Sequence, residues 1–328
     1  MAVSHIDLND EQQRSIQAIV VAGSNADKGE ILRRRSAFFA HYTSADTLKK
    51  IADARGFYLR NTRLMNDHSE VWHGFGTVLD AMKQTTGGVQ YLSAWGKIDP
   101  SVEERLPSLV ESAAQLVIPN CYILSVCEHI EPDDNNGLLS MWRAYGDGEV
   151  RVAVLARPAL VAPMATQGVF LTPVIYGDVA KVGTELEAKA SALLSHRSVF
   201  AGFEPDWLLH LALGVTTNLA VAVKHPGFAE EREWRFVYMP NFPSAEMLSR
   251  REAVVWGGTP QIVYRMPIGL PCDPDFDPAR LFLERIVLGP CHEQNTVRAG
   301  LVAMLERFGF QNAEDLVTAS SIPFRRRM

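Results

Sequence analysis

Short strand-like segments recur along the whole chain at irregular intervals, and this pattern narrows the possible folds more than any other feature. Each segment is rich in aromatic and β-branched residues, which favour strands. A doubly wound parallel fold alternates strands with helices at regular steps, whereas the steps here are irregular. We therefore predict an α+β fold with mixed or antiparallel central sheets. The predicted strands cover residues 38–42, 57–60, 122–126, 150–156, 170–176, 234–238, 253–255, 261–265, 284–288 and 316–320.

Helical patterns fill most of the remaining chain. Helices are predicted in residues 8–36, from a cap at Ser44 or Asp46 to a stop at Gly56, after a cap at Asn66 or Asp67, in 102–117, in 181–224 with a break near 202–205, and in 293–308. No Pro- or Gly-rich linker separates two halves. We predict a helical N-terminal extension, 1–36, followed by a single α+β domain, 37–328, that contains a helical insertion.

The overall charge is mildly acidic. The 328 residues carry a net charge of −6, with 47% hydrophobic and 21% charged side chains, which is ordinary for a globular protein. Dedicated nucleic-acid binders usually present a basic face, so this balance argues against that class. It leaves nucleic acid open as a substrate, for which a local basic patch would suffice.

The cysteines and the apolar segments point to an intracellular protein without a structural zinc site. The four cysteines, at 121, 127, 272 and 291, show neither Cys-x-x-Cys nor zinc-finger spacing. The first residues include several acids and no apolar stretch of the kind found in signal peptides. Residues 207–223 are the most apolar, but they are short for a membrane span and are interrupted by polar side chains. We expect a buried helix there, a cytoplasmic protein and no membrane partner.

A charged block precedes one late strand. Glu231 and Glu233 stand two residues apart at the entrance of the strand predicted at 234–238. Because side chains alternate along a strand, both carboxylates are expected to point to the same side. Paired acids can act as a general base or stabilise a positive transition state. The plainer alternative is a solvated strand end with Glu–Arg pairs.

A histidine lies on the first predicted strand. His41 is followed by Tyr42, Thr43 and Ser44 at the turn into a helix. A histidine ring offers both a donor and an acceptor, and a helix N-terminus favours anions such as phosphate. The alternative is a hydrogen-bonded core histidine beside an ordinary helix cap.

The segment after the second predicted strand is rich in polar side chains. Arg60 is followed by Asn66, Asp67, His68 and Glu70. Acids in a first helical turn also suit the helix dipole and resemble a capping box. The functional interpretation is that Asn66 and Glu70 hold a loop against a ligand, while Asp67, His68 and Glu70 have the atom types of a metal site.

Aromatic residues follow the third predicted strand. Ser125 stands at the end of an apolar run, and Trp142 and Tyr145 lie three residues apart, on one face of a helix. An aromatic pair beside a cleft can sandwich a flat ring such as nicotinamide or adenine. The alternative for Trp142 is a place in the core.

Several familiar signatures are missing from the sequence. There is no Gly-x-Gly-x-x-Gly fingerprint and no phosphate-binding P-loop. There is also no Gly-x-Ser-x-Gly elbow and no His-Glu-x-x-His helix. These absences argue against Rossmann oxidoreductases, P-loop NTPases, α/β-hydrolases and the common zinc proteases.

Taken together, the sequence blocks resemble a bacterial family known as domain of unknown function 2971. They keep the order of that family from about residue 38 to the end of the chain, and residues 1–36 fall outside the resemblance. The matching blocks are residues 41–44, 64–70, 124–125, 140–145, 174–176, 231–235, 286–290 and 321–325.

The layout of this family is in turn similar to ADP-ribosyltransferase folds, which implies a split β core. Those enzymes use a His or Arg on a first strand, a Ser or Tyr on a second and a catalytic Glu on a late strand. By resemblance, these roles fall to His41, to Ser125 or Tyr145, and to Glu233 with Glu231 before it. The sequence departs from the pattern in lacking a Ser-Thr-Ser triplet after the second of these strands, and Trp142 with Tyr145 replaces the usual aromatic loop.

The resemblance implies NAD as a substrate and an ADP-ribosyl transfer that passes through an oxocarbenium-like state. A carboxylate beside the ribose stabilises that charge, as in glycoside chemistry, and Glu233 is expected to fill this role while Glu231 orients or deprotonates the acceptor. Arg60 or Arg235 is expected to meet the pyrophosphate, since Arg gives bidentate contacts to phosphate. The alternative for Arg235 is that it neutralises the two acids. The expected cofactor-binding residues are His41, Tyr42, Thr43, Arg60, Asn66, Glu70, Ser125, Trp142, Tyr145 and Arg235.

The sequence leaves the acceptor and two other functions open. The acceptor could be a protein or a nucleic acid, and the protein a toxin or phage-defence effector with an antitoxin or other partner. One alternative is a non-catalytic nucleotide-binding or interaction module. The other is a metal-dependent hydrolase or nuclease built on Asp67, His68, Glu70 and the Glu231/Glu233 pair.

Overall fold

A computed structural model describes most of the chain, and its contacts divide the chain into two compact units. The described residues are 8–23, 28–29, 36–65, 69–145, 150–157, 168–240, 250–256, 258–268 and 283–323. One unit, called the helical unit here, consists of Met1–Gly29, Thr62–Cys121 and Thr172–Ala229. The other, called the sheet unit, consists of Glu30–Asn61, Tyr122–Leu171 and Glu230–Met328. The predicted boundary between an N-terminal extension, 1–36, and a single α+β domain, 37–328, stays a prediction.

The helical unit packs its helices around the buried helix that the sequence predicted. Residues 207–223 fall almost entirely within α9, most of whose side chains are buried. Within the described residues, no helix is long and apolar enough to cross a membrane. The helices of this unit are α1 (Asp10–Val21), α4 (Glu70–Gln84), α5 (Thr86–Gly96), α6 (Pro100–Val117), α8 (Val179–Ser195) and α9 (Pro205–Ala222), and β6 (Ile175–Tyr176) pairs in parallel with β7 (Val223–Lys224).

Helix α5 was absent from the sequence prediction because its first turn contains two glycines. Gly87 and Gly88 are poor helix formers, but both are buried. A Cβ atom on Gly87 would lie 2.0 Å from the main-chain oxygen of Gly183 on α8. The glycines therefore serve the close approach of two helices, which local propensity does not reveal.

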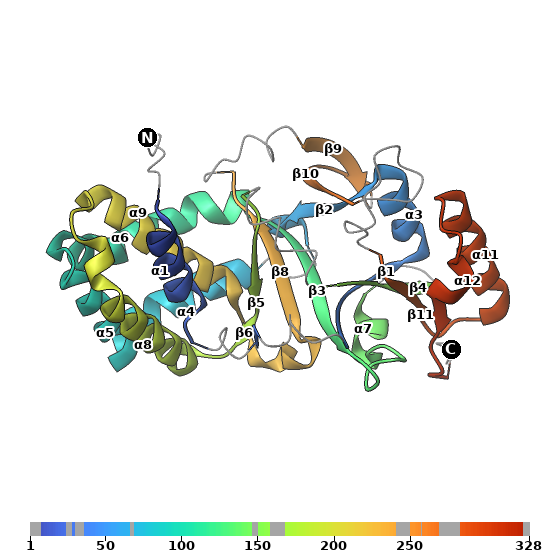
Figure 1. Cartoon of the computed structure of the whole chain (residues 1–328), viewed down its shortest axis with the longest axis horizontal. Helices are drawn as coiled ribbons and strands as arrows, with labels where there is room; N and C mark the ends of the chain where they lie inside the picture. Colours follow the sequence, from blue (N-terminus) through green and yellow to red (C-terminus); the bar gives the residue numbers. More distant parts are fainter. Residues whose placement is uncertain are drawn as a thin grey trace. The chain divides into compact units, whose positions relative to one another are not determined.

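The sheet unit contains the mixed sheet that the sequence predicted (Figure 1). Its strand order is β12-β11-β4-β1-β3-β2-β10-β9, and β8 pairs with β3 and with β5. Strand β11 runs parallel to β12, whereas β3 runs antiparallel to each of β1, β2 and β8. The strands are β1 (Ala37–Ser44), β2 (Gly56–Asn61), β3 (Tyr122–Ile130), β4 (Arg151–Ala156), β5 (Phe170–Pro173), β8 (Glu233–Tyr238), β9 (Arg251–Trp256), β10 (Thr259–Pro267), β11 (Arg285–Leu288) and β12 (Val317–Ala319).

The sheet branches at β3. One edge of β3 pairs with β8 over residues 122–127. The opposite edge pairs with β2 over residues 122–123 and with β1 over residues 127–130. Residues 124–126 therefore lie where β1 and β2 separate, and their main-chain groups on that edge lack a strand partner in these registers.

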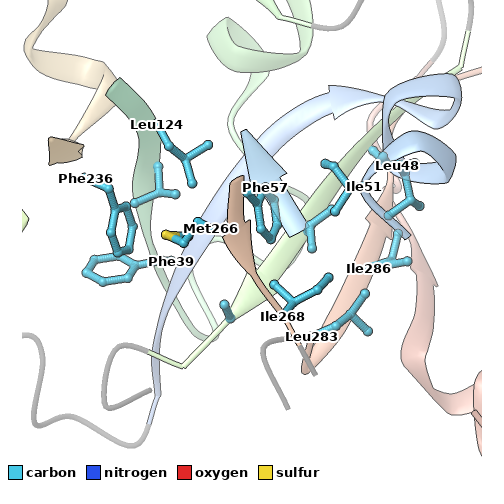
Figure 2. Packing of buried hydrophobic residues seen from close by; sticks show 14 of the residues in the cluster. Phe39, Leu48, Ile51, Phe57, Leu124, Phe236, Met266, Ile268, Leu283 and Ile286 are labelled. Carbon is cyan, nitrogen blue, oxygen red and sulfur yellow. The ribbon is translucent and has the colours of Figure 1, made fainter. Parts of the chain in front are cut away.

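One face of the sheet is apolar and carries the main core. Phe39, Leu124 and Phe236 belong to this core, together with Leu48 and Ile51 from α3 (Ala45–Ala54) (Figure 2). Helices α11 (Gln294–Arg307) and α12 (Ala313–Leu316) add further buried side chains to the same cluster. We call this the core face of the sheet.

The other face carries a smaller apolar cluster and the polar residues of interest. Phe38, Ala40 and Cys127 pack there against Met141 and Trp142 of α7 (Leu139–Ala144). Because side chains alternate along a strand, the odd-numbered residues of β3 and β8 share this face. We call it the polar face.

The turn from α3 into β2 differs in detail from the prediction. Ser44 caps α3, its hydroxyl accepting a hydrogen bond from the amide of Thr47 at 3.1 Å, as one of the predicted caps required. The helix ends at Ala54, and Arg55 adopts the left-handed conformation with φ +50°. Gly56 begins β2 and does not stop the helix, because Arg55 already provides the left-handed cap. A Cβ atom on Gly56 would lie 2.6 Å from Arg265 Cγ, so the glycine allows the close approach of β10.

Candidate functional site

A buried ionic group lies on the polar face where β3 pairs with β8. Glu233 begins β8, and its Oε1 atom accepts hydrogen bonds from Ser125 Oγ at 2.6 Å and from Arg235 Nε at 3.0 Å. Arg235 Nη2 also donates to Glu233 Oε2 at 3.3 Å. Glu233 and Arg235 are 3% and 1% exposed. A carboxylate so deeply buried requires such partners, because desolvation of an unpaired charge is costly.

The two glutamates do not share a strand as the sequence predicted. Glu231 ends a short 3-10 helix, η6 (Pro226–Glu231), and Arg232 follows with φ +45°. The alternation rule for strands therefore fails between Glu231 and Glu233. Glu231 is also buried, and its Oε1 atom accepts a hydrogen bond from the Tyr145 hydroxyl at 3.4 Å.

Two contacts hold the left-handed residue between the glutamates. The Arg232 guanidinium lies 2.8 Å from Asp134 Oδ2. Its main-chain oxygen accepts a hydrogen bond from the amide of Glu128 at 2.9 Å. The backbone that separates the two acids is thus tied to β3 itself and to the turn that follows it. Asp134 could not be predicted from the sequence, because no motif marks it and it stands 98 residues before Arg232.

His41 reaches the site through the main chain of β3. Its Nδ1 atom donates a hydrogen bond to the Ser125 carbonyl oxygen at 3.0 Å, at the point where β1 and β2 separate. Burial lowers the pKa of His41 below 6.5, and this hydrogen bond partly opposes the effect. The imidazole is therefore neutral at pH 7, with Nε2 as an acceptor.

His41 lies on the core face, away from the glutamates. Its ring packs edge-on against Phe57 with 5.3 Å between centroids, and Phe57 belongs to the core cluster. Thr43, two residues further along β1, is also buried. The structure therefore links His41 with Ser125 and Glu233 by hydrogen bonds, but not by a shared face of the sheet.

Trp142 and Tyr42 occupy the apolar part of the polar face. Trp142 is 2% exposed, its indole N–H donates to the Asn136 carbonyl at 2.9 Å, and its ring centroid lies 4.7 Å from that of Tyr42. Cβ atoms on Gly137 and Gly289 would lie 2.5 and 2.9 Å from the indole ring. The two glycines, which have no side chains, thus leave the space that the indole ring of Trp142 occupies.

Tyr145 has a different environment from Trp142. It lies just after α7, is partly buried, and its hydroxyl contacts Glu231. Burial raises the pKa of Tyr42, whose hydroxyl accepts a hydrogen bond from the amide of Leu138 at 2.9 Å. Of the predicted aromatic residues, Tyr145 is therefore the one in contact with a predicted catalytic acid.

The remaining predicted residues are spread over the two units. Arg60 Nε donates to Gln261 Oε1 at 3.1 Å, and its guanidinium lies 5.0 Å from the centroid of the Trp256 ring. Glu70 belongs to the helical unit, where it pairs with Lys224 at 2.8 Å. Asn66, Asp67 and His68 lie outside the described residues.

The described residues offer no preformed metal centre. Within them, no group of three or more His, Cys, Asp or Glu side chains is placed to hold a metal ion. Glu70 and the Glu231/Glu233 pair belong to different units. Chemically, the site provides a carboxylate paired with Arg235, a second acid bonded by a phenol, and a neutral imidazole linked through Ser125 to the first carboxylate only.

Comparison with known proteins gives one match. Residues 141–236 match the model of a family described as protein of unknown function, DUF2971. This span includes Trp142, Tyr145, Glu231, Glu233 and Arg235. No curated protein and no solved structure matches the chain. The resemblance predicted from the sequence is thus confirmed over residues 141–236, where the chain matches this family.

Proposed function

We propose that the protein is a NAD-dependent ADP-ribosyltransferase with Glu233 as its catalytic carboxylate. The observation that carries this proposal is the chain of hydrogen bonds from His41 through Ser125 to Glu233. These residues stand on a first, a second and a late strand, the order that the resemblance implies, with His41 on the opposite face of the sheet from Glu233. A split ADP-ribosyltransferase-like core is part of the same proposal, and the branch at β3 supports it.

The proposed reaction breaks the bond between nicotinamide and ribose. The bonding electron pair leaves with nicotinamide, which departs as a neutral ring, and positive charge develops on the ribose. Glu233 would stabilise that charge, since a fixed carboxylate in a dry site acts more strongly than one in water. The acceptor would then bond to the ribose carbon and lose its proton to Glu231.

Other residues take supporting roles in this proposal. Tyr145, which contacts Glu231, is a better placed stacking partner for nicotinamide than Trp142, whose ring is enclosed by two glycines. Arg60 would meet the pyrophosphate, because a guanidinium makes paired contacts with phosphate oxygens. The acceptor would be a protein or nucleic acid of the cytoplasm, and a toxin or phage-defence role with a neutralising partner would fit such an activity.

The test follows nicotinamide release from NAD by the purified protein and by the Glu233→Gln variant. Removal of a transition-state contact of this kind typically lowers a rate about 100- to 1,000-fold, so we expect at least a 100-fold loss. Because the amide keeps the shape of the side chain, calorimetry should still detect NAD binding by the variant.

The matched control is Glu128→Gln. Glu128 is 5% exposed on β3 and accepts a hydrogen bond from Trp234 on the core face. This variant makes the same chemical change at a comparably buried site and should retain release. Equal losses in both variants would show that the effect is structural. Release that is unchanged in Glu233→Gln, or no NAD binding by the native protein, would refute the proposal.

A second candidate is a non-catalytic nucleotide-binding module. It is favoured by the ion pair between Glu233 and Arg235, both almost fully buried, because a neutralised carboxylate is less able to stabilise a cation. This alternative predicts NAD binding without release, even when cell extract is supplied as a source of acceptors.

A further inference from the structure

The strand β9 forms an edge of the sheet in the described part of the chain. It ends the strand order and pairs with β10, and no other strand in the described part of the chain pairs with it (Figure 1). Arg251, Ala253 and Val255 are exposed, and Val255 is 68% exposed. Among the large hydrophobic side chains described as exposed, none exceeds this value.

The hydrogen-bond pattern shows which main-chain groups of β9 face outward. The amide of Arg265 on β10 donates to the carbonyl of Arg250 at 3.0 Å, so residues 250 and 265 form a hydrogen-bonded pair. Such pairs alternate along an antiparallel ladder. Glu252 and Val254 therefore direct their main-chain groups toward β10, while Arg251, Ala253 and Val255 direct theirs away from the sheet.

Within residues 251–256, this edge has neither a proline nor a bulge. Natural edge strands often carry proline, a bulge or an inward-pointing charge. Strand β9 contains no proline. The carboxylate of Glu252 accepts hydrogen bonds from Arg265 at 2.6 Å and Tyr58 at 3.2 Å, so its charge is neutralised within the same sheet.

The far end of β9 is held in place by two cations. The guanidinium of Arg60 and the ammonium of Lys50 lie 5.0 and 5.5 Å from the centroid of the Trp256 ring. Contacts of this kind contribute about 0.5–1 kcal/mol each at exposed sites. The edge is thus ordered before any partner arrives, which reduces the entropy cost of pairing.

We propose that β9 is a dimerisation strand that pairs antiparallel with β9 of a second copy of this chain. The two-fold axis would pass through Ala253, so that Ala253 faces its own copy and Arg251 faces Val255 of the partner subunit. In this register, the main-chain N–H and C=O groups of Arg251, Ala253 and Val255 all face the outward main-chain groups of the second copy. It places the smallest side chain of the strand at the axis and sets no like charges directly opposite one another.

A second copy fits this edge better than an unrelated strand for reasons of symmetry. An antiparallel pair supplies donors and acceptors from identical residues on both sides, as a two-fold interface requires. A register centred on Glu252 would place its carboxylate directly against its own copy, which is unfavourable. The register centred on Ala253 avoids that contact.

The first experiment measures the mass of the full chain in solution by light scattering after size exclusion. We expect twice the 36.4 kDa of one chain for the native protein. The Val255→Lys variant should halve this mass, because two lysines would then oppose two Arg251 side chains across the axis. The control Leu116→Lys makes the same change at a residue of α6 that is 64% exposed, and it should leave the dimer intact.

A charge reversal tests the register. In the Arg251→Glu, Val255→Lys double variant, opposite charges face one another across the axis, so the dimer should return. A double variant that stays monomeric while Val255→Lys is folded, as judged by circular dichroism, would contradict the register.

A crosslink tests the position of the axis. Hydrogen-bonded partners in an antiparallel ladder have Cα atoms about 5.5 Å apart, a separation that a disulfide spans. Mild oxidation should therefore link the Ala253→Cys variant into a covalent dimer. The two copies of Val255 would lie four residues apart along the strand, about 13 Å, so Val255→Cys should not link.

Each result bears on the dimer alone. A native protein that is monomeric throughout a dilution series would overturn the proposal, as would a dimer that Val255→Lys leaves intact. Nicotinamide release and NAD binding play no part in these measurements, so the proposed transferase activity can fail while the dimer holds, or the reverse.

Discussion

Two fully buried charged side chains, one in each unit, are satisfied in different ways. In the helical unit, Lys189 of α8 is 2% exposed, and its ammonium donates to the main-chain oxygens of Ile19, Val20 and Ala22 at 2.7–3.3 Å. In the sheet unit, Glu233 is 3% exposed and accepts hydrogen bonds from the side chains of Ser125 and Arg235.

The difference suggests separate purposes for the two charges. Lys189 supplies donors to the unpaired carbonyls at the C-terminal end of α1, a common capping arrangement. The main-chain partners cannot rearrange unless the helix moves, so the contact of Lys189 stabilises the fold. The partners of Glu233 are side chains, which can exchange one hydrogen bond for another when a ligand enters. Buried charge held by side chains is therefore the better marker of a functional site.

The largest expected effect is on stability, from removal of the partner of Glu233. In Arg235→Met the carboxylate stays buried and loses its neutralising group. Breaking a buried ion pair in this way costs about 3–5 kcal/mol. Urea unfolding followed by circular dichroism should show this loss.

Two variants make that result specific. In the Arg235→Met, Glu233→Leu double variant the buried charge is absent, so the loss should be smaller than in Arg235→Met alone. Arg157→Met removes an arginine that pairs with Glu284 at 2.7 Å but is 43% exposed, so it should cost less than about 1 kcal/mol. A double variant less stable than the single one would show that the pair is not the source of the effect.

A smaller loss is expected in Lys189→Met. The methionine fits an apolar site, but the carbonyls at the end of α1 lose a donor, which costs about 1–3 kcal/mol. Hydrogen exchange should quicken in α1 more than in α9. Lys83→Met, which changes an exposed lysine of α4, serves as the control and should leave exchange unchanged.

The same lysine predicts a pH dependence of stability. Burial lowers the pKa of Lys189 from 10.5 to about 8. Between these values the unfolded chain binds more protons than the folded one, so the free energy of unfolding rises with pH. The stability of the native protein relative to Lys189→Met should therefore increase from pH 8 to 10.5. A difference that is constant over this range would contradict a buried lysine.

The strands were the most predictable part of the fold. Runs of aromatic and β-branched residues located β1, β2, β3 and β8 to within a few residues, because alternation with burial is a local property. The branch at β3 could not be predicted from the sequence. The strand pairs that form it join residues more than 60 positions apart, such as Arg60 and Ile123. Registers of that kind depend on tertiary packing.

Part of the buried ionic group could be named from the sequence, but its geometry could not. Ser125 and Glu233 were both expected, yet their hydrogen bond spans 108 residues. Strand alternation, the ground for predicting a shared direction of Glu231 and Glu233, does not apply to them, because Arg232 leaves the extended conformation with φ +45°. A non-glycine residue seldom adopts that conformation, and here Asp134 and the amide of Glu128 hold it there.

The smallest expected effect concerns His41, whose partly buried imidazole donates to one main-chain oxygen at 3.0 Å. Replacement by asparagine shortens the side chain and removes the hydrogen bond to Ser125, which should cost about 1 kcal/mol. Because burial lowers the pKa of His41 below 6.5, the unfolded chain binds more protons just below that pH, so the contribution of His41 is complete above pH 6.5 and shrinks as the pH falls.

His210→Asn is the matched control, since His210 is exposed on α9 and its Nδ1 atom also bonds a main-chain oxygen, that of Asp206 at 2.6 Å. Unfolding curves between pH 7 and pH 5 should converge for the native protein and His41→Asn. Curves that stay parallel would mean that His41 is solvated, and the link from β1 to Ser125 and Glu233 would then lose its physical basis.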